Sequence, residues 1–195
     1  MRELNLITIL GHDKPAVTSA ITDVLSQYHA KILDIGQAVI HDNLSLSMLV
    51  EISDSTMSAL AFERISTCAS VLDMQVRFQP ISEASYTDWV AQQGKQRHIV
   101  SLLAREITAE QITCLTRIMA AHSLNIDNIS RLSGRVPLDS EEHNTRACVE
   151  FSARGYVADI PQLRAEFSEL ASILNVDIAF QEDNMYRRTR RLVCF

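Results

Sequence analysis

The sequence has few of the residues that mark several classes of protein. Only 5 glycines and 4 prolines occur among 195 residues, too few for a collagen-like or low-complexity chain. The uncharged stretches are too short and too polar to span a bilayer. The N-terminal segment lacks the apolar run and the small-residue cleavage site of a signal peptide. We therefore expect a cytoplasmic protein without a membrane partner.

The chain also has fewer positive than negative charges. The chain has 18 Lys and Arg against 24 Asp and Glu, a formal net charge of −6. This excess of negative charge repels phosphate backbones and argues against a nucleic-acid partner. A basic cluster occurs at Arg187, Arg188, Arg190 and Arg191, and a cluster of this size needs no nucleic acid to explain it.

Motifs that carry catalytic chemistry are missing. The chain has no phosphate loop and none of the patterns G-x-G-x-x-G, G-x-S-x-G or H-E-x-x-H. The six histidines show no metal-ligand spacing with cysteines or carboxylates. The four cysteines form no C-x-x-C pair, so we expect free thiols packed as small hydrophobic groups. The sequence thus predicts no catalytic residues, no metal site and no cofactor in this chain.

Hydrophobic periodicity predicts the same order of elements twice, β-α-β-β-α-β. The first set comprises strand Leu4–Leu10, a helix from Ala16, strands Ile32–Ile40 and Leu44–Ile52, helix Thr56–Ala69 and strand Leu72–Phe78. The second set comprises strand His98–Ala104, helix Thr108–His122, strands Ile126–Leu132 and Ala147–Ala153, helix Ile160–Asn175 and strand Val176–Phe180.

A constant spacing supports a true repeat. Adding 94 takes Leu4 to His98, Leu6 to Val100, Ile21 to Leu115, Leu25 to Met119, Lys31 to Asn125 and Ile32 to Ile126. Two such units in tandem predict an α+β protein made of two ferredoxin-like βαββαβ domains. We place them at residues 1–81 and 97–183, with a polar linker at 82–96. Each open sheet has edges and one face that need cover, so side-by-side pairing is expected.

The turn between the first strand and the first helix is the candidate site. Gly11–Pro15 places free backbone N–H groups and the positive end of a helix dipole where a carboxylate can bind. Asp13 either caps the helix or holds the ammonium group of a zwitterion. Lys31 and its counterpart Asn125 begin the next strand of each unit, where they either complete a small-molecule site or lie exposed at an edge.

The β-α-β-β-α-β repeat with a G-x-D-x-P turn resembles the ACT domain, a regulatory module that binds amino acids where two such domains meet. The resemblance implies ligand-binding roles for His12, Asp13, Lys14, Pro15, Ala16, Lys31 and Asn125. Ala16 stands where the family usually has Gly, and Lys31 where it usually has Asn. In the second unit the turn pattern is lost over Arg105–Ala109, so we favour the first unit's turn as the binding part.

Longer blocks are similar to the N-terminal tandem ACT region of bacterial phosphoserine phosphatases. They are ILDIGQAVIHD (32–42), VRFQPIS (76–82), GKQRHIVSLLAR (94–105), LNIDNISRLSGRVPLD (124–139) and LNVDIAFQED (174–183). RRTRRLVCF (187–195) is similar to the strand that enters that family's haloacid dehalogenase-like catalytic domain. The resemblance implies that residues 184–195 are a linker and the first strand of a catalytic domain whose nucleophilic Asp lies beyond Phe195.

If this resemblance holds, the parent enzyme hydrolyses O-phospho-L-serine to L-serine and phosphate with Mg²⁺, and the present chain has no phosphatase activity. The implied partners are L-serine or a related amino acid, a second copy in a homodimer, and the chain's own catalytic domain. Two alternatives stay open: a stand-alone tandem-ACT regulator of the glycine-cleavage type, and a ligand-free dimerisation module. An RNA-binding ferredoxin-like domain is excluded by the charge and by the lack of paired aromatics on the central strands.

Overall fold

The computed structural model describes residues 3–92, 95–134 and 146–183 of the chain. The expected C-terminal linker and strand at 184–195, with its arginine cluster, lie outside the described residues. The chain divides into two compact units, one ending at Gln92 and one beginning at Gln93. Each unit has its own sheet, helices and core.

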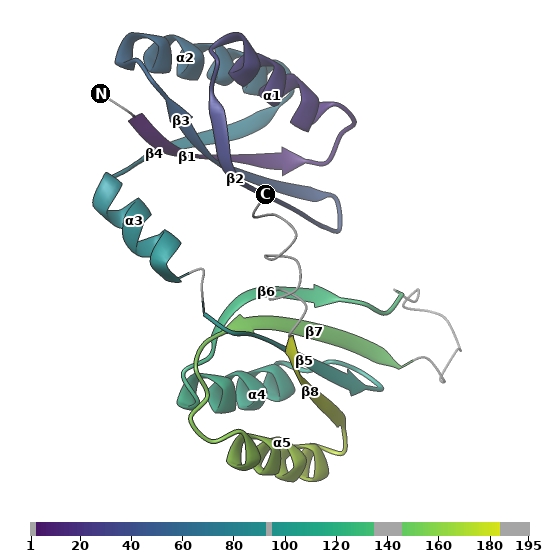
Figure 1. The fold of residues 1–195 in the computed structure, drawn as a ribbon. Coiled ribbons are helices and arrows are strands. Elements are labelled where there is room, and N and C mark those ends of the chain that lie inside the picture. Colours follow the sequence, from purple (N-terminus) through teal and green to yellow (C-terminus); the bar gives the residue numbers. More distant parts are fainter. Residues whose placement is uncertain (1–2, 93–94, 135–145, 184–195) are drawn as a thin grey trace. The chain divides into compact units, whose positions relative to one another are not determined.

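The first unit contains the predicted βαββαβ order followed by one further helix (Figure 1). Its elements are β1 (Glu3–His12), α1 (Val17–Gln27), β2 (Lys31–Ile40), β3 (Asn43–Ile52), α2 (Ser55–Val71), β4 (Met74–Ile81) and α3 (Glu83–Gln92). The sheet order is β2-β3-β1-β4, and all neighbouring strands are antiparallel. Helices α1 and α2 lie together on one face of this sheet (Figure 1).

The second unit repeats this arrangement. Its elements are β5 (Arg97–Ala104), α4 (Ala109–Ala121), β6 (Asn125–Arg131), β7 (Ala147–Arg154), α5 (Ile160–Leu174) and β8 (Asp177–Asp183). The sheet order is β6-β7-β5-β8, again antiparallel throughout. The predicted fold of two tandem ferredoxin-like domains is therefore confirmed.

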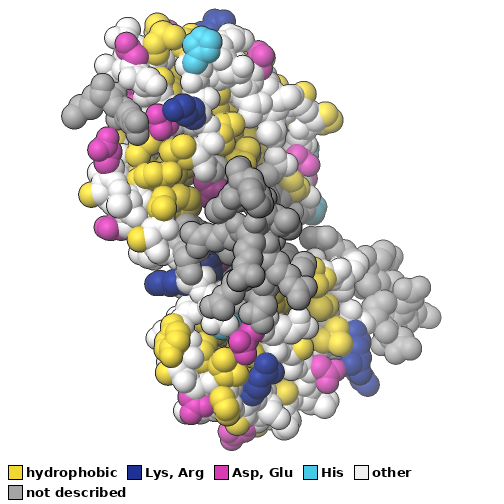
Figure 2. Space-filling view, in the orientation of Figure 1, with side chains coloured by type: hydrophobic (Ala, Val, Ile, Leu, Met, Phe, Trp, Pro, Cys, Tyr) yellow, Lys and Arg dark blue, Asp and Glu magenta, His cyan; other side chains and the backbone are white. Residues whose placement is uncertain are grey.

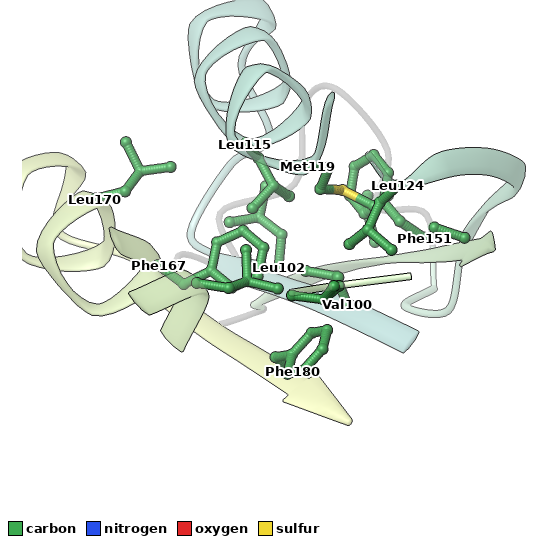
Figure 3. Packing of buried hydrophobic residues seen from close by; sticks show 13 residues of the cluster. Val100, Leu102, Leu115, Met119, Leu124, Phe151, Phe167, Leu170 and Phe180 are labelled. Atoms are coloured by element: carbon green, nitrogen blue, oxygen red, sulfur yellow. The ribbon is translucent and has the colours of Figure 1, made fainter. Parts of the chain in front are cut away.

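Alternating apolar residues place one core under each pair of helices. In the first unit the buried residues of β1 and β3 include Ile7, Ile9 and Met48, and they meet Ile21 and Ile65 of the helices. In the second unit the corresponding cluster joins the sheet to α4 and α5. Figure 3 shows its members Val100, Leu102, Leu115, Met119, Leu124, Phe151, Phe167, Leu170 and Phe180 pointing toward one another.

The predicted spacing of 94 is correct for the helices and second strands but wrong for the first strands. Ile7 lies opposite Met48 and Phe78, whereas Val100 lies opposite Phe151 and Phe180, so these two buried positions are equivalent at a spacing of 93. Leu6 instead faces away from the helices. A one-residue shift turns a strand's side chains to the other face, which the sequence spacing alone did not reveal.

Two local assignments also differ from expectation. Leu72 was predicted to open a strand but is the C-cap of α2, and the left-handed residue Asp73 (φ 57°) separates it from β4. The predicted linker contains a ten-residue helix, α3, with its first turn held by a hydrogen bond from the Tyr86 N–H to the Ser82 carbonyl (3.0 Å).

Gly155 should tolerate no side chain. It follows β7, where an added Cβ would lie 2.3 Å from the Ser123 carbonyl oxygen, a backbone atom that cannot easily move. We expect Gly155→Ala to destabilise the second unit by about 1–3 kcal/mol, the usual cost of overpacking. Urea denaturation followed by circular dichroism measures this. Gly36→Ala is the matched control, because nothing lies within 4 Å of its Cβ position; equal stability of the two variants would contradict the assignment.

Candidate functional site

The β1–α1 turn is held in place by the neighbouring β2–β3 hairpin. The Asp13 N–H donates to the carbonyl oxygen of Asp42 (2.7 Å), and Nδ1 of His12 lies 3.0 Å from the same oxygen. His12, Asp13, Pro15 and Ala16 are exposed. The turn is thus a fixed but open surface.

Lys14 anchors the other side of the turn. Its Nζ donates to the carbonyl oxygen of Leu72, the C-cap residue of α2 (3.1 Å). A cation at this place also interacts favourably with the negative end of the α2 dipole. The Lys14 ammonium group is therefore engaged within the unit, and Lys14 positions the turn.

Asp42 gives the hairpin beside the turn a negative charge. Nδ1 of His41 donates to Oδ1 of Asp42 (2.5 Å), and His12 Nδ1 lies 3.5 Å from Oδ2. The hydrogen bond from His41 is the largest cause that holds the pKa of Asp42 below its usual value, and the proximity of His12 contributes less. This carboxylate is therefore ionised at neutral pH.

The N-terminus of α1 lacks the side-chain cap that three other helices have. Its N-cap is Ala16, in the left-handed region (φ 71°, ψ 0°), and no side chain there accepts a hydrogen bond. In contrast, Asp54, Thr108 and Asp159 cap α2, α4 and α5. The interpretation of Asp13 as an ordinary N-cap is therefore wrong. The first N–H groups of α1 and the positive end of its dipole are open to an anionic group.

The corresponding turn of the second unit is closed by its own side chains. Thr108 and Gln111 form a reciprocal capping box at the start of α4. Beside it lies a polar cavity of about 410 Å³, which is lined by Arg105 and Glu106 among others. Arg146 and Asp177, which pair at 2.7 Å, also line this cavity. Sequence reasoning missed these charges because they come from three segments that are far apart in the sequence.

Lys31 and the turn lie at opposite ends of the first sheet. Lys31 is opposite Glu51 on β3, whereas Ile40, at the other end of β2, is opposite Asn43 beside the turn. Nine residues of extended strand separate Lys31 from Ile40, about 30 Å. Lys31 Nζ pairs with Glu51 at 3.4 Å. A single first unit therefore does not bring Lys31 to His12–Ala16.

Asn125 occupies the equivalent place in the second unit. It begins β6 opposite Arg154, whose Nε pairs with Asp127 at 2.6 Å. Asn125 belongs to the other unit and shares no element with the first unit's turn. The predicted site residues therefore fall into three places: His12–Ala16 at the turn, Lys31 at the start of β2 and Asn125 at the start of β6.

Strand β2 is an exposed sheet edge with apolar side chains. Of its ten residues only Leu33 is half-buried and the rest are exposed, including Ile35 at 50% and Ile40 at 74%. The opposite edge, β4, carries Pro80, which cannot donate to a further strand. An exposed edge strand without proline has backbone donors and acceptors that no strand of its own sheet pairs, and β2 is such a strand.

Other chemistry-bearing residues form no second constellation in the described parts of the chain. There, no three His, Cys, Asp or Glu side chains are grouped so as to hold a metal ion. The described cysteines Cys68, Cys114 and Cys148 are free thiols, as predicted, while Cys194 lies outside the described residues. In the same segments, no helix combines the length and hydrophobicity needed to cross a bilayer.

Comparison with known proteins finds the same module twice. Models of the ACT domain match residues 3–79 and 96–181. Phosphoserine phosphatase SerB2 of Mycobacterium tuberculosis is 31% identical over 198 residues, which cover 97% of this chain and 43% of that protein. Phosphoserine phosphatase of Streptomyces coelicolor is 28% identical over 188 residues, which cover 96% of this chain and 42% of that protein. The chain thus spans less than half the length of these curated relatives.

Solved structures share the tandem arrangement at low sequence identity. A protein of unknown function from Galdieria sulphuraria superposes with a TM-score of 0.68 at 12% identity, covering 93% of this chain and 99% of that one. A protein assigned as a glycine cleavage system transcriptional repressor superposes with a TM-score of 0.65 at 16% identity, covering 93% and 97%. At these identities the likeness shows the fold alone.

Ala16 should be a strained position that glycine relieves. The left-handed conformation costs a residue with a Cβ about 1–2 kcal/mol. Replacement by glycine removes this cost, but the greater freedom of glycine in the unfolded chain offsets part of the gain in stability. We expect Ala16→Gly to stabilise the first unit by about 0.5–1 kcal/mol in urea denaturation. Ala20→Gly, inside α1, should instead destabilise it by about 1 kcal/mol. Loss of stability in both variants would refute the strain at Ala16.

Proposed function

Because the chain belongs to the ACT-domain family, we propose that it is a regulatory region that binds a small amino acid and dimerises through its ACT domains. The open N-terminus of α1 is the observation that carries this proposal. Uncapped N–H groups on a turn fixed by the hairpin suit the carboxylate of an amino acid. The adjacent carboxylates of Asp13 and Asp42 suit its ammonium group.

The proposed effector is L-serine or a related amino acid. The curated relatives are named phosphoserine phosphatases, and removal of phosphate from phosphoserine yields serine. Serine carries the carboxylate and the ammonium group that the N–H groups and carboxylates of the turn suit. The exposed turn cannot enclose a ligand by itself, so the site needs a second unit.

Pairing through β2 explains how Lys31 would reach the turn. Two β2 strands that pair antiparallel about a two-fold axis place the start of one beside the end of the other. Lys31 of one copy would then lie near the β1–α1 turn of its partner, although the two are about 30 Å apart within one unit. The resulting site would contain turn residues from one copy and a strand residue from the other.

Regulation would follow from the different affinity of the ligand for two arrangements of the paired domains. A ligand that favours one arrangement shifts the equilibrium by its differential affinity, typically about 1–3 kcal/mol. In a full-length phosphoserine phosphatase this shift between the two arrangements would be transmitted to the catalytic domain. That protein would be cytoplasmic and would use Mg²⁺ in its catalytic domain, and the present chain would not hydrolyse phosphoserine by itself.

A stand-alone regulator of the glycine-cleavage type is the second proposal. It is favoured by the tandem structure that this chain matches over 97% of that protein's length. The source gene distinguishes the two proposals. Codons for Asp-x-Asp-x-Ser/Thr directly after Phe195 support the phosphatase, whereas a stop codon supports the regulator.

Calorimetric titration with L-serine tests the binding site. We expect saturable heat with L-serine, less with D-serine, and at least about tenfold weaker binding in Asp13→Ala, because a charge-assisted hydrogen bond is lost. Asp23→Ala, an exposed carboxylate on α1, is the matched control. Thermal unfolding should shift by the equivalent of about 2.7 kcal/mol at a hundredfold excess over Kd. No heat and no shift at millimolar L-serine would favour the ligand-free dimerisation module.

Sedimentation velocity tests the dimer. Ile35→Lys places a charge on the exposed β2 edge, where pairing would bury it, and should convert dimer to monomer without unfolding the chain. Val71→Lys changes a residue that is 82% exposed at the end of α2 and should leave the dimer intact. A monomeric unaltered chain, or equal dissociation by both variants, would exclude pairing through β2.

A further inference from the structure

A small cavity lies on the open face of the first sheet, away from α1 and α2. Its volume is about 240 Å³. The floor is a row across three neighbouring strands: Asp34 of β2 lies opposite Leu49 of β3, and Leu49 lies opposite Leu6 of β1. Ile81, at the end of β4, and three residues of α3 complete the lining. The cavity belongs wholly to the first unit.

Helix α3 contributes the aromatic part of this cavity. Tyr86 and Trp89 both line it, and their ring centroids are 5.9 Å apart with planes tilted by 35°. Their spacing of three residues puts them on one side of the helix. Figure 2 shows apolar side chains gathered on the first unit beside α3. Neither aromatic residue is fully buried, and Trp89 is 37% exposed, so solvent reaches the ring.

Asp34 is the one acidic residue in the cavity lining. Its Oδ1 accepts a hydrogen bond from the Ile35 N–H (2.9 Å), which orients the carboxylate at the β-bulge between Ile32 and Asp34. Lys31, three residues earlier, is engaged by Glu51 at 3.4 Å. Within the described segments Asp34 has no ion-pair partner, so its charge is available to a ligand.

We propose that this cavity binds a small organic cation, a primary ammonium group on a short chain that carries one ring. The apolar floor takes the ring by hydrophobic burial. The ammonium group binds beside the Asp34 carboxylate and close to two π systems, which attract cations. The volume lies below the about 300 Å³ of the smallest drug-sized pockets, which limits the ligand to a single ring. The negative charge of Asp34 would repel an anion.

This site differs from the proposed effector site in position and chemistry. The effector site uses the α1 N-terminus, the β1–α1 turn and Lys31 of a partner's β2, whereas the cavity uses Asp34 of β2, the open sheet face and α3. Because α3 follows the first ferredoxin-like fold directly and holds two of the lining aromatics, a bound cation would tie this helix to the sheet. Either site can therefore fail its test without affecting the other.

Trp89 reports binding directly because it is the only tryptophan of the chain. The experiment titrates the 195-residue chain with three probes of similar shape while Trp89 fluorescence is recorded: 2-phenylethylammonium, 2-phenylethanol and 3-phenylpropanoate. We expect a saturable change with the cation, about tenfold weaker binding of the neutral alcohol, and no saturation with the anion. Equal affinities, or no saturable change with the cation at millimolar concentration, would overturn the proposal.

Two variants assign the effect to the cavity. Asp34→Asn keeps an oxygen for the Ile35 N–H but removes the charge, so the preference for the cation over the alcohol should shrink to the part that the two π systems supply. Asp23→Asn, on α1, should leave the preference unchanged. Leu6→Phe fills the floor and should weaken all binding. An undiminished preference in Asp34→Asn would overturn the proposal, and the probe series on the unaltered chain decides the question even if a variant fails to fold.

Discussion

In each unit one pair of helices covers one face of the sheet, and this one-sided helical cover governs the remaining features of the protein. Two helices cover the four strands from one side, where alternating residues such as Ile7, Ile9 and Met48 are fully buried. Among the residues that the structure describes, no second pair of helices covers the other side. An outer strand of each sheet keeps unpaired backbone groups. The exposed β2 edge and the α3 cavity both arise from this one-sided cover.

The β1–α1 turn illustrates how an exposed surface can be fixed in place without being buried. Backbone and side-chain hydrogen bonds join it to Asp42 and Leu72, both of which lie far from the turn in the sequence. Its conformation places Ala16 in the left-handed region and leaves α1 without a side-chain cap. Strain and open hydrogen-bond donors thus occur at the same place. Such a combination is typical of functional sites, where the surrounding structure maintains a locally costly conformation.

The two units differ in the turn where the first unit carries its candidate site. At the equivalent position of the second unit, Thr108 and Gln111 satisfy the helix N-terminus internally, and the adjacent cavity carries arginines and carboxylates instead. The buried frameworks remain equivalent, because Val100 and Leu102 take the places of Ile7 and Ile9. A duplicated fold has kept its core while its turns have acquired different chemistry.

The fold could be predicted from the sequence because hydrophobic periodicity and turn residues act locally. Strand β3, with apolar residues at every second position, is the clearest example. The residues of the turn were also found from sequence. Only the tertiary structure decided that Lys31 lies at the far end of the sheet from that turn, and that Asp34, Leu49 and Leu6 form one row under α3. Strand register and direction set these positions, because they depend on pairing between distant segments and not on the local pattern.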